Sequence, residues 1–197
     1  MSNSWTISTA ASELPISLTD MKLFLRVDST ADNALISTLI EVATDVVQEC
    51  VSKQFVDASY TWNMDSFPTL DTDILYIPMN PLDSVTSIKY YDTDGDQQTW
   101  SSDDYIVDTN SLKGRIYLAA DTSWPTTEAR YDAVEVIFKA GYSADATSVP
   151  KAAIQAIQLL VTHWYENRQA VQTGPVAREV PLGFDFLLSN LMIPTVH

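Results

Sequence analysis

Three aspartates at alternate positions, Asp92, Asp94 and Asp96, are the strongest candidates for metal chemistry in this chain. Hard cations such as Ca²⁺ prefer clustered carboxylates, and this alternation is how a calcium-binding loop begins. Such a loop also needs glycine at its sixth position and glutamate at its twelfth, where this sequence has Gln97 and Asp103. The Asp-Gly pair inside the run is instead typical of a tight hairpin turn, because it supplies positive φ angles. We therefore predict a hairpin turn here and no metal site.

Residues suited to catalysis are few. The chain has two histidines, His163 and His197, and lacks the G-x-S-x-G, H-E-x-x-H and paired-cysteine motifs. Its five glycines are too dispersed for a phosphate-binding loop. His163 and Glu166 have the spacing of two metal ligands on a helix, but a histidine near a helix C-terminus is favourable without a metal. We predict no catalytic residue, cofactor or metal; paired aspartates, as in glycoside hydrolases, are the enzymatic alternative left open.

The single cysteine, Cys50, rules out an internal disulfide and a thiolate zinc cluster. It falls on an apolar helix face, so we predict a small buried core residue rather than a reactive thiol.

Acidic residues dominate the charge, with 26 acidic against 11 basic side chains and a net charge of −15. Most of the excess lies between Asp57 and Asp145. Ordinary binding of nucleic acid is disfavoured, because it depends on Lys and Arg displacing counterions from phosphates. The acidity is compatible either with a wall that repels DNA or with surface solubility alone.

No apolar run reaches the ~18 residues that a membrane span needs. Residues 1–15 lack the basic and apolar regions of a signal peptide, and we predict a flexible arm there.

Two long segments, residues 31–53 and 149–171, have the apolar periodicity of an α-helix. Their polar residues are confined to a narrow stripe, so apolar residues cover more than half of each circumference. We therefore predict that both helices are broadly buried and pack against each other. The predicted core of this pair contains Leu39, Val46, Ile157, Leu160 and Trp164.

Between these helices the periodicity changes to two, which indicates a small antiparallel sheet. The predicted strands are 60–64, 74–77, 85–91, 97–100, 105–107, 115–118 and 134–138. The expected fold class is α+β, a helical connector core of two long packed helices plus short N- and C-terminal helices, with an antiparallel β-rich insertion between the long helices. The predicted domains are the arm at 1–15, the helical core at 16–58 and 146–172, the insertion at 59–145, and a linker and C-terminal docking segment at 173–197.

Short helices are predicted after Ser17, which has capping-box spacing to Asp20, and over residues 184–191. The second is too apolar for a free tail and either covers the subunit's own core or docks on a partner. The candidate docking residues are Phe184, Phe186, Leu187, Leu188, Leu191 and Ile193.

A set of individually short motifs, in a fixed order, covers nearly the whole chain beyond residue 15. In chain order they are Ser17 to Asp28 (SLTDMKLFLRVD), Asp32 to Ile36, Pro81 to Ile88 with Tyr90, Asp104 to Asp108, Gly114 to Ile116, Trp124-Pro125, Val149-Pro150, Ala156 to Arg168 and Pro181 to Asp185. As a set, they resemble the head-tail connector (adaptor) proteins of tailed bacteriophages and gene transfer agents.

The resemblance implies a structural virion protein without catalytic residues, located in the neck of the particle and, during assembly, in the host cytoplasm. It implies a ring, expected to be a dodecamer, under the portal protein. The other implied partner is a head-closure (stopper) or tail-completion protein, and double-stranded DNA would pass through the channel without specific binding. No membrane partner is expected. The alternative is a small acidic β-rich binding module for a carbohydrate or a metal ion.

Overall fold

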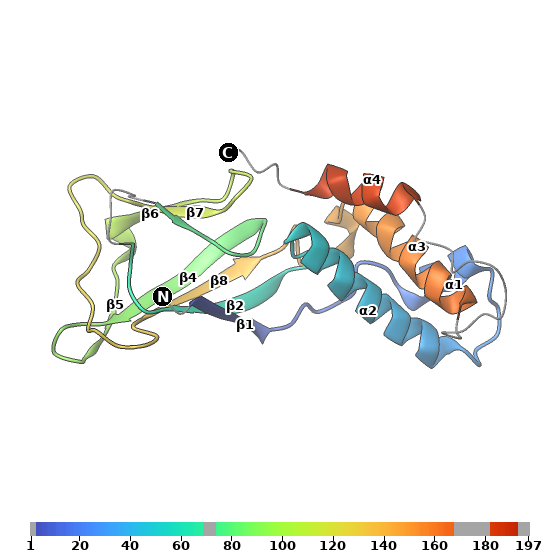
Figure 1. Cartoon of the computed structure of the whole chain (residues 1–197), viewed down its shortest axis with the longest axis horizontal. Helices are drawn as coiled ribbons and strands as arrows, with labels where there is room; N and C mark the ends of the chain where they lie inside the picture. Colours follow the sequence, from blue (N-terminus) through green and yellow to red (C-terminus); the bar gives the residue numbers. More distant parts are fainter. Residues whose placement is uncertain (1–2, 69–73, 168–181, 193–197) are drawn as a thin grey trace. The chain divides into compact units, whose positions relative to one another are not determined.

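The computed structural model describes residues 3–68, 74–167 and 182–192 (Figure 1). The chain divides into two compact units. The β unit comprises residues 1–12 and 56–144, and the helical unit comprises residues 13–55 and 145–197. No helix in the described ranges is long and apolar enough to cross a membrane.

The larger sheet of the β unit is antiparallel and has the strand order β1-β2-β8-β4-β5. Its strands are β1 (Asn3–Thr9), β2 (Ala58–Met64), β4 (Leu82–Tyr91), β5 (Gln97–Thr99) and β8 (Val134–Ala140). β2 and β8 alternate strictly between buried and half-buried side chains, as the period of two predicts. Their buried residues face each other across the ladder, for example Tyr60 opposite Phe138.

The smaller sheet is also antiparallel, with the order β3-β7-β6. It consists of β3 (Ile74–Tyr76), β6 (Tyr105–Asp108) and β7 (Arg115–Leu118), and a short 3₁₀ turn, Ser102–Asp104, precedes β6.

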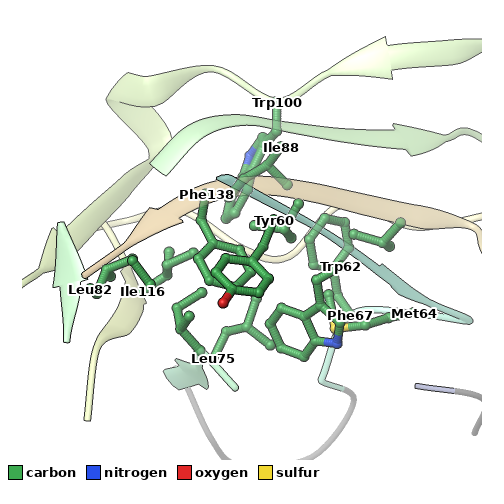
Figure 2. Packing of buried hydrophobic residues seen from close by; sticks show 14 of the residues in the cluster. Tyr60, Trp62, Met64, Phe67, Leu75, Leu82, Ile88, Trp100, Ile116 and Phe138 are labelled. Carbon is green, nitrogen blue, oxygen red and sulfur yellow. The ribbon is translucent and has the colours of Figure 1, made fainter. Parts of the chain in front are cut away.

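Both sheets contribute to one apolar core in the β unit (Figure 2). Tyr60, Trp62 and Phe138 enter it from the larger sheet, and Leu75 and Ile116 enter it from the smaller one. The rings of Tyr60 and Phe138 stack with their centroids 5.2 Å apart. Burial of these aromatic side chains holds the two sheets together, because each Å² of apolar surface removed from water contributes about 25 cal/mol to stability.

The helical unit contains α1 (Leu18–Leu25), α2 (Asn33–Val51), α3 (Lys151–Glu166) and α4 (Leu182–Leu191). A 3₁₀ turn, Ala146–Ser148, precedes α3. The predicted N-terminal cap of α1 is confirmed, since the Ser17 side chain accepts a hydrogen bond from the Asp20 backbone N–H at 3.1 Å.

Contacts among α1, α2, α3 and α4 bury one face of each long helix. The buried residues of α2 and α3 are Ile36, Ile40, Ala43, Thr44, Val47, Val51, Ala153, Ala156, Ile157, Leu160 and Val161. Of the predicted core, Ile157 and Leu160 are buried, whereas Leu39, Val46 and Trp164 are half-buried. The described part of the subunit therefore buries less of each helix than the width of its apolar face predicts.

The predicted fold class, a helical core of two long packed helices with a β insertion, is wrong. The described chain is β-rich, with eight strands in two antiparallel sheets and four short helices of 8 to 19 residues. The error came from taking the apolar segment at 149–171 as the organising element, although α3 already ends at Glu166.

The flexible arm predicted at 1–15 also differs from the structure, because residues 3–9 form β1 and pair with β2. Of the predicted linker and docking segment, residues 173–181 and 193–197 lie outside the described residues.

Candidate interaction surfaces

The C-terminal helix α4 has one face on the helical unit and one face exposed. Phe184, Leu188 and Leu191 are buried, and α4 contacts α3 and α2. Phe186 is 68% exposed and Leu187 is half-buried, while Ile193 lies beyond the described residues. The candidate docking residues thus separate into three that attach α4 to its own subunit and two that remain available at its surface. Met192, one residue beyond α4, is also exposed.

The run of alternating aspartates forms the predicted hairpin turn between β4 and β5. One Asp92 carboxylate oxygen, Oδ1, accepts hydrogen bonds from the backbone N–H groups of Asp94 and Asp96, at 3.1 and 3.0 Å. The other, Oδ2, accepts one from the Gln98 side chain at 2.8 Å, and this bond is the main reason that the pKa of Asp92 lies below its ordinary value. Gly95 supplies the positive φ of 86°. The Asp92 carboxylate therefore organises the turn.

Further acidic residues gather at the same end of the larger sheet. The ends of β2 and β4 and the start of β8 meet here, because Val134 pairs with both Met64 and Tyr90. The Asp132 N–H donates to the Asp65 carboxylate at 3.3 Å. The Glu128 N–H donates to the Tyr91 carbonyl at 3.0 Å. We name the acidic sheet end as Asp65, Asp92, Asp94, Asp96, Glu128 and Asp132.

Basic side chains do little to offset this charge. The β unit has fifteen acidic and five basic residues, a net charge of −10. Four of the five basic side chains form ion pairs with acids of the same unit. The pairs are Lys89–Glu135, Arg115–Asp108, Arg130–Glu128 and Lys139 with both Asp57 and Asp83. Few unpaired basic side chains are left to attract a phosphate backbone. The β unit therefore has the same sign of net charge as DNA and should repel it.

Asp108, at the end of β6, is the most strongly perturbed carboxyl among the described residues. Its Oδ2 accepts hydrogen bonds from the Ser111 hydroxyl at 2.6 Å and from the Arg115 Nε at 2.9 Å. These two partners, Ser111 first, hold the pKa of Asp108 well below its ordinary value. The guanidinium of Arg115 also lies over the Tyr117 ring, 4.8 Å from its centroid. The cluster ties the loop after β6 to β7.

This cluster predicts a specific acid sensitivity. A carboxyl with a depressed folded-state pKa stabilises the fold above its unfolded pKa, 3.8, and loses that contribution as the pH falls towards the folded-state pKa. Asp108→Asn should therefore lower the free energy of unfolding near neutral pH, and its difference from wild type should shrink below pH 3.8. Urea unfolding at a series of pH values measures this difference. Thr109→Ala, at the exposed neighbouring residue, is the control; a pH-independent difference for Asp108→Asn would contradict the assignment.

An aromatic cluster in the β unit borders a surface hollow. Phe67 stacks on Trp124 with their ring centroids 5.3 Å apart, and Trp100 lies 5.2 Å from Trp124. The hollow has a volume of about 440 Å³ and is lined by Ser66, Phe67, Pro68, Trp124, Pro125, Thr126 and Thr127. The indole N–H of Trp124 is buried and has no hydrogen-bond partner among the described residues. A carbohydrate-binding function, the alternative from the sequence, would use this hollow.

The remaining residues considered for chemistry lie apart from one another. His163 is half-buried in the last turn of α3, and Glu166, one turn on, is exposed. No group of three or more His, Cys, Asp or Glu within the described ranges is placed to hold a metal ion. Cys50 is exposed, so its prediction as a buried core residue is wrong. The helix face that carries Cys50 is apolar, but none of the described residues covers Cys50.

Comparisons with known proteins find one family and three solved structures that resemble this chain. Residues 15–175 match the model of a family described as head completion protein. A chain from the neck of an empty gene transfer agent (GTA) particle, computed with C6 symmetry, superposes with a TM-score of 0.81. Chains from a native GTA virion and from the neck of a native GTA particle, computed with C12 symmetry, give TM-scores of 0.78 and 0.73. Each is 19% identical and covers 98% of this chain and 97% of its own length, which establishes a shared fold. None of the curated proteins matches the chain.

Proposed function

This chain belongs to the head completion protein family, and from that premise we propose that it forms a ring under the portal and joins the DNA-filled head to the tail. The resemblance seen in the sequence is thereby confirmed at the level of the family. The role is that of a structural head-tail connector in the virion. A structural neck protein needs no catalytic machinery, so we assign the chain no enzymatic activity.

One observation carries this proposal: the family match and the fold match both extend over most of the chain. The matched neck chains come from particles computed with C6 and C12 symmetry, which supports a ring of this chain. We place the ring, as a dodecamer, between the portal protein and a head-closure or tail-completion protein. The alternative of a carbohydrate- or metal-binding module has less support, because the aromatic hollow alone favours it.

The exposed face of α4 is our candidate for portal docking. Phe184, Leu188 and Leu191 fix α4 on its own subunit, so its outer face keeps a defined orientation. Phe186 is a large apolar side chain that is 68% exposed on that face. Exposed aromatic side chains on a rigid helix are typical anchors for a groove on another protein. Repeated around a ring, even a modest contact of this kind gives high avidity.

The charge of the β unit gives it a second part in the same function. DNA that passes through a connector must slide without adhering, and a surface with net negative charge and paired cations disfavours adhesion. We propose that the acidic sheet end borders the DNA channel.

Phe186→Asp tests the docking assignment. The side chain is exposed, so the variant should keep the wild-type circular dichroism and melting temperature. Its incorporation into portal-containing heads should fall about 30-fold, since loss of a central aromatic anchor costs about 2 kcal/mol. Quantitative immunoblotting of purified heads measures incorporation.

The matched control is Ser148→Asp, which adds the same charge at an exposed position outside α4. Normal incorporation of Phe186→Asp would place portal docking elsewhere in the chain. Absence of the wild-type protein from the necks of particles, checked by electron microscopy with specific antibody, would overturn the proposed function itself.

A further inference from the structure

An apolar stripe runs along α2 outside the core of the helical unit. We define the α2 stripe as Leu35, Leu39, Val42 and Val46. The steps of four, three and four place these residues on one helix face. Leu35 and Val42 are 38% and 45% exposed, and the other two are half-buried. Side chains of this size in one row form an apolar surface that the described subunit leaves uncovered.

Acidic residues border this stripe along one side. Glu41, Asp45 and Glu49 follow one another at steps of four, and all three are exposed. Asp45 lies three residues after Val42, and Glu49 lies three residues after Val46, so each acid neighbours a member of the stripe. None of the three forms an ion pair within the described part of the chain. A partner for the stripe should therefore be apolar with a positive charge at its edge.

The C-terminal end of α1 has this complementary character. We define the α1 tip as Leu23, Phe24 and Arg26; Leu23 is 72% exposed, Phe24 is 42% exposed, and Arg26 is exposed. The tip has a fixed backbone, because Arg26 adopts a left-handed conformation with φ 57° and its N–H bonds to the Leu23 carbonyl. Arg26 has no ion-pair partner among the described residues.

We propose that, in the ring, the α1 tip of one copy packs on the α2 stripe of the next copy, with Arg26 facing Asp45 and Glu49. This inference rests on the proposed function, because it assigns the contact between neighbouring subunits of that ring. A ring requires two different and complementary surfaces on each subunit, joined head to tail. The charges select a second copy over an unrelated partner, since one chain carries both the acid-bordered stripe and the basic tip. Leu23 and Phe24 supply the apolar area, and Arg26 sets the register.

Charge exchange tests the pairing without removing apolar surface. Asp45→Lys with Glu49→Lys should reduce ring formation at least tenfold, because Arg26 then meets like charge; Arg26→Glu alone should do the same. Combining all three changes should return ring formation to within about threefold of wild type, since the charges are again opposite. Glu166→Lys, at an exposed acid of α3, is the control and should leave ring formation unchanged. Light scattering of concentrated full-length protein and electron microscopy of necks measure the fraction in rings.

Cysteine cross-linking gives an independent readout. Glu49 is exposed and faces Arg26 in the proposed contact, and Cys50, which is also exposed, is replaced by serine so that it does not compete. In assembled necks treated with a mild oxidant, Arg26→Cys with Glu49→Cys in a Cys50→Ser background should form an inter-subunit disulfide and yield a ladder of covalent multimers. Arg26→Cys alone in the Cys50→Ser background should give no ladder.

Two results together would overturn this contact and leave the proposed function standing: the charge exchange fails to restore rings, and the Arg26→Cys, Glu49→Cys pair gives no ladder in necks that otherwise resemble wild type. Absence of a wild-type ring from necks would instead overturn the proposed function.

Discussion

Replacing Gly141 with alanine is expected to lower the free energy of unfolding by about 3 kcal/mol or more, since overpacking against fixed atoms and a strained φ each cost about 1–3 kcal/mol. Gly141 follows β8 and has a φ of 145°, a conformation that residues with a Cβ rarely adopt. A Cβ built there would lie 2.5 Å from the Asp57 Cα and 2.6 Å from the Asp57 backbone nitrogen.

Asp57 has little freedom to move away from such a methyl group. Its N–H donates to the Ser143 carbonyl at 3.0 Å, and its carboxylate pairs with Lys139 at 2.7 Å. The strain should therefore appear as lost stability of the β unit, which urea unfolding followed by tryptophan fluorescence measures.

The chain offers a matched control for this substitution at Gly183 in α4. A Cβ there meets nothing within 4 Å, and alanine is the better helix former by about 1 kcal/mol. Gly183→Ala should leave the stability of the β unit unchanged. Equal stability of Gly141→Ala and wild type would mean that the chain after β8 takes another path.

The sequence predicted those elements that depend on residues close to one another in the chain. The turn at Asp92–Asp96 needs only a short side chain that bonds its own backbone and a glycine with positive φ, and both occur within five residues. The strands around Tyr60 and Phe138 bury alternate residues, so their period of two was visible. The order of strands was not predictable in this way, because β8 lies between β2 and β4 through pairing across tens of residues.

Strand β1 was missed because its side chains are exposed on both faces of the sheet. Residues 4–9 are all exposed, including Trp5 and Ile7. Burial therefore does not alternate along β1, as it would in a strand with one buried face. Its position depends on the β2 backbone, which pairs with it from Asn3 to Thr9 with one register shift between Ile7 and Thr9. Backbone pairing at a sheet edge leaves little trace in side-chain chemistry.

Apolar helix positions gave wrong predictions of burial where the proposed contacts lie between subunits. Cys50, Leu39 and Val46 were predicted to be buried in the subunit, because an apolar helix face is usually a core face. The structure leaves these positions exposed or half-buried. If the α1 tip of a neighbouring copy covers the α2 stripe, the same apolar pattern is satisfied between subunits. One sequence cannot separate these two kinds of burial, whereas exposed fractions in the folded subunit do.

Reversing charge at the acidic sheet end is expected to hold DNA in the particle. Asp94→Lys with Asp96→Lys keeps the turn, which depends on the Asp92 carboxylate and Gly95, and adds two lysines per copy around the ring. If this end borders the channel, triggered particles should retain DNA at about 50 mM salt and release it again near about 200 mM, because roughly six phosphate contacts lose about 10³-fold in affinity over that range. Quantitative PCR of released and retained DNA measures the effect.

The neutral variant Asp94→Asn with Asp96→Asn should retain far less DNA, which separates the effect of added positive charge from the effect of lost carboxylates. Wild-type release by the lysine variant at every salt concentration would place the acidic sheet end away from the DNA path and leave its carboxylates a role in solubility.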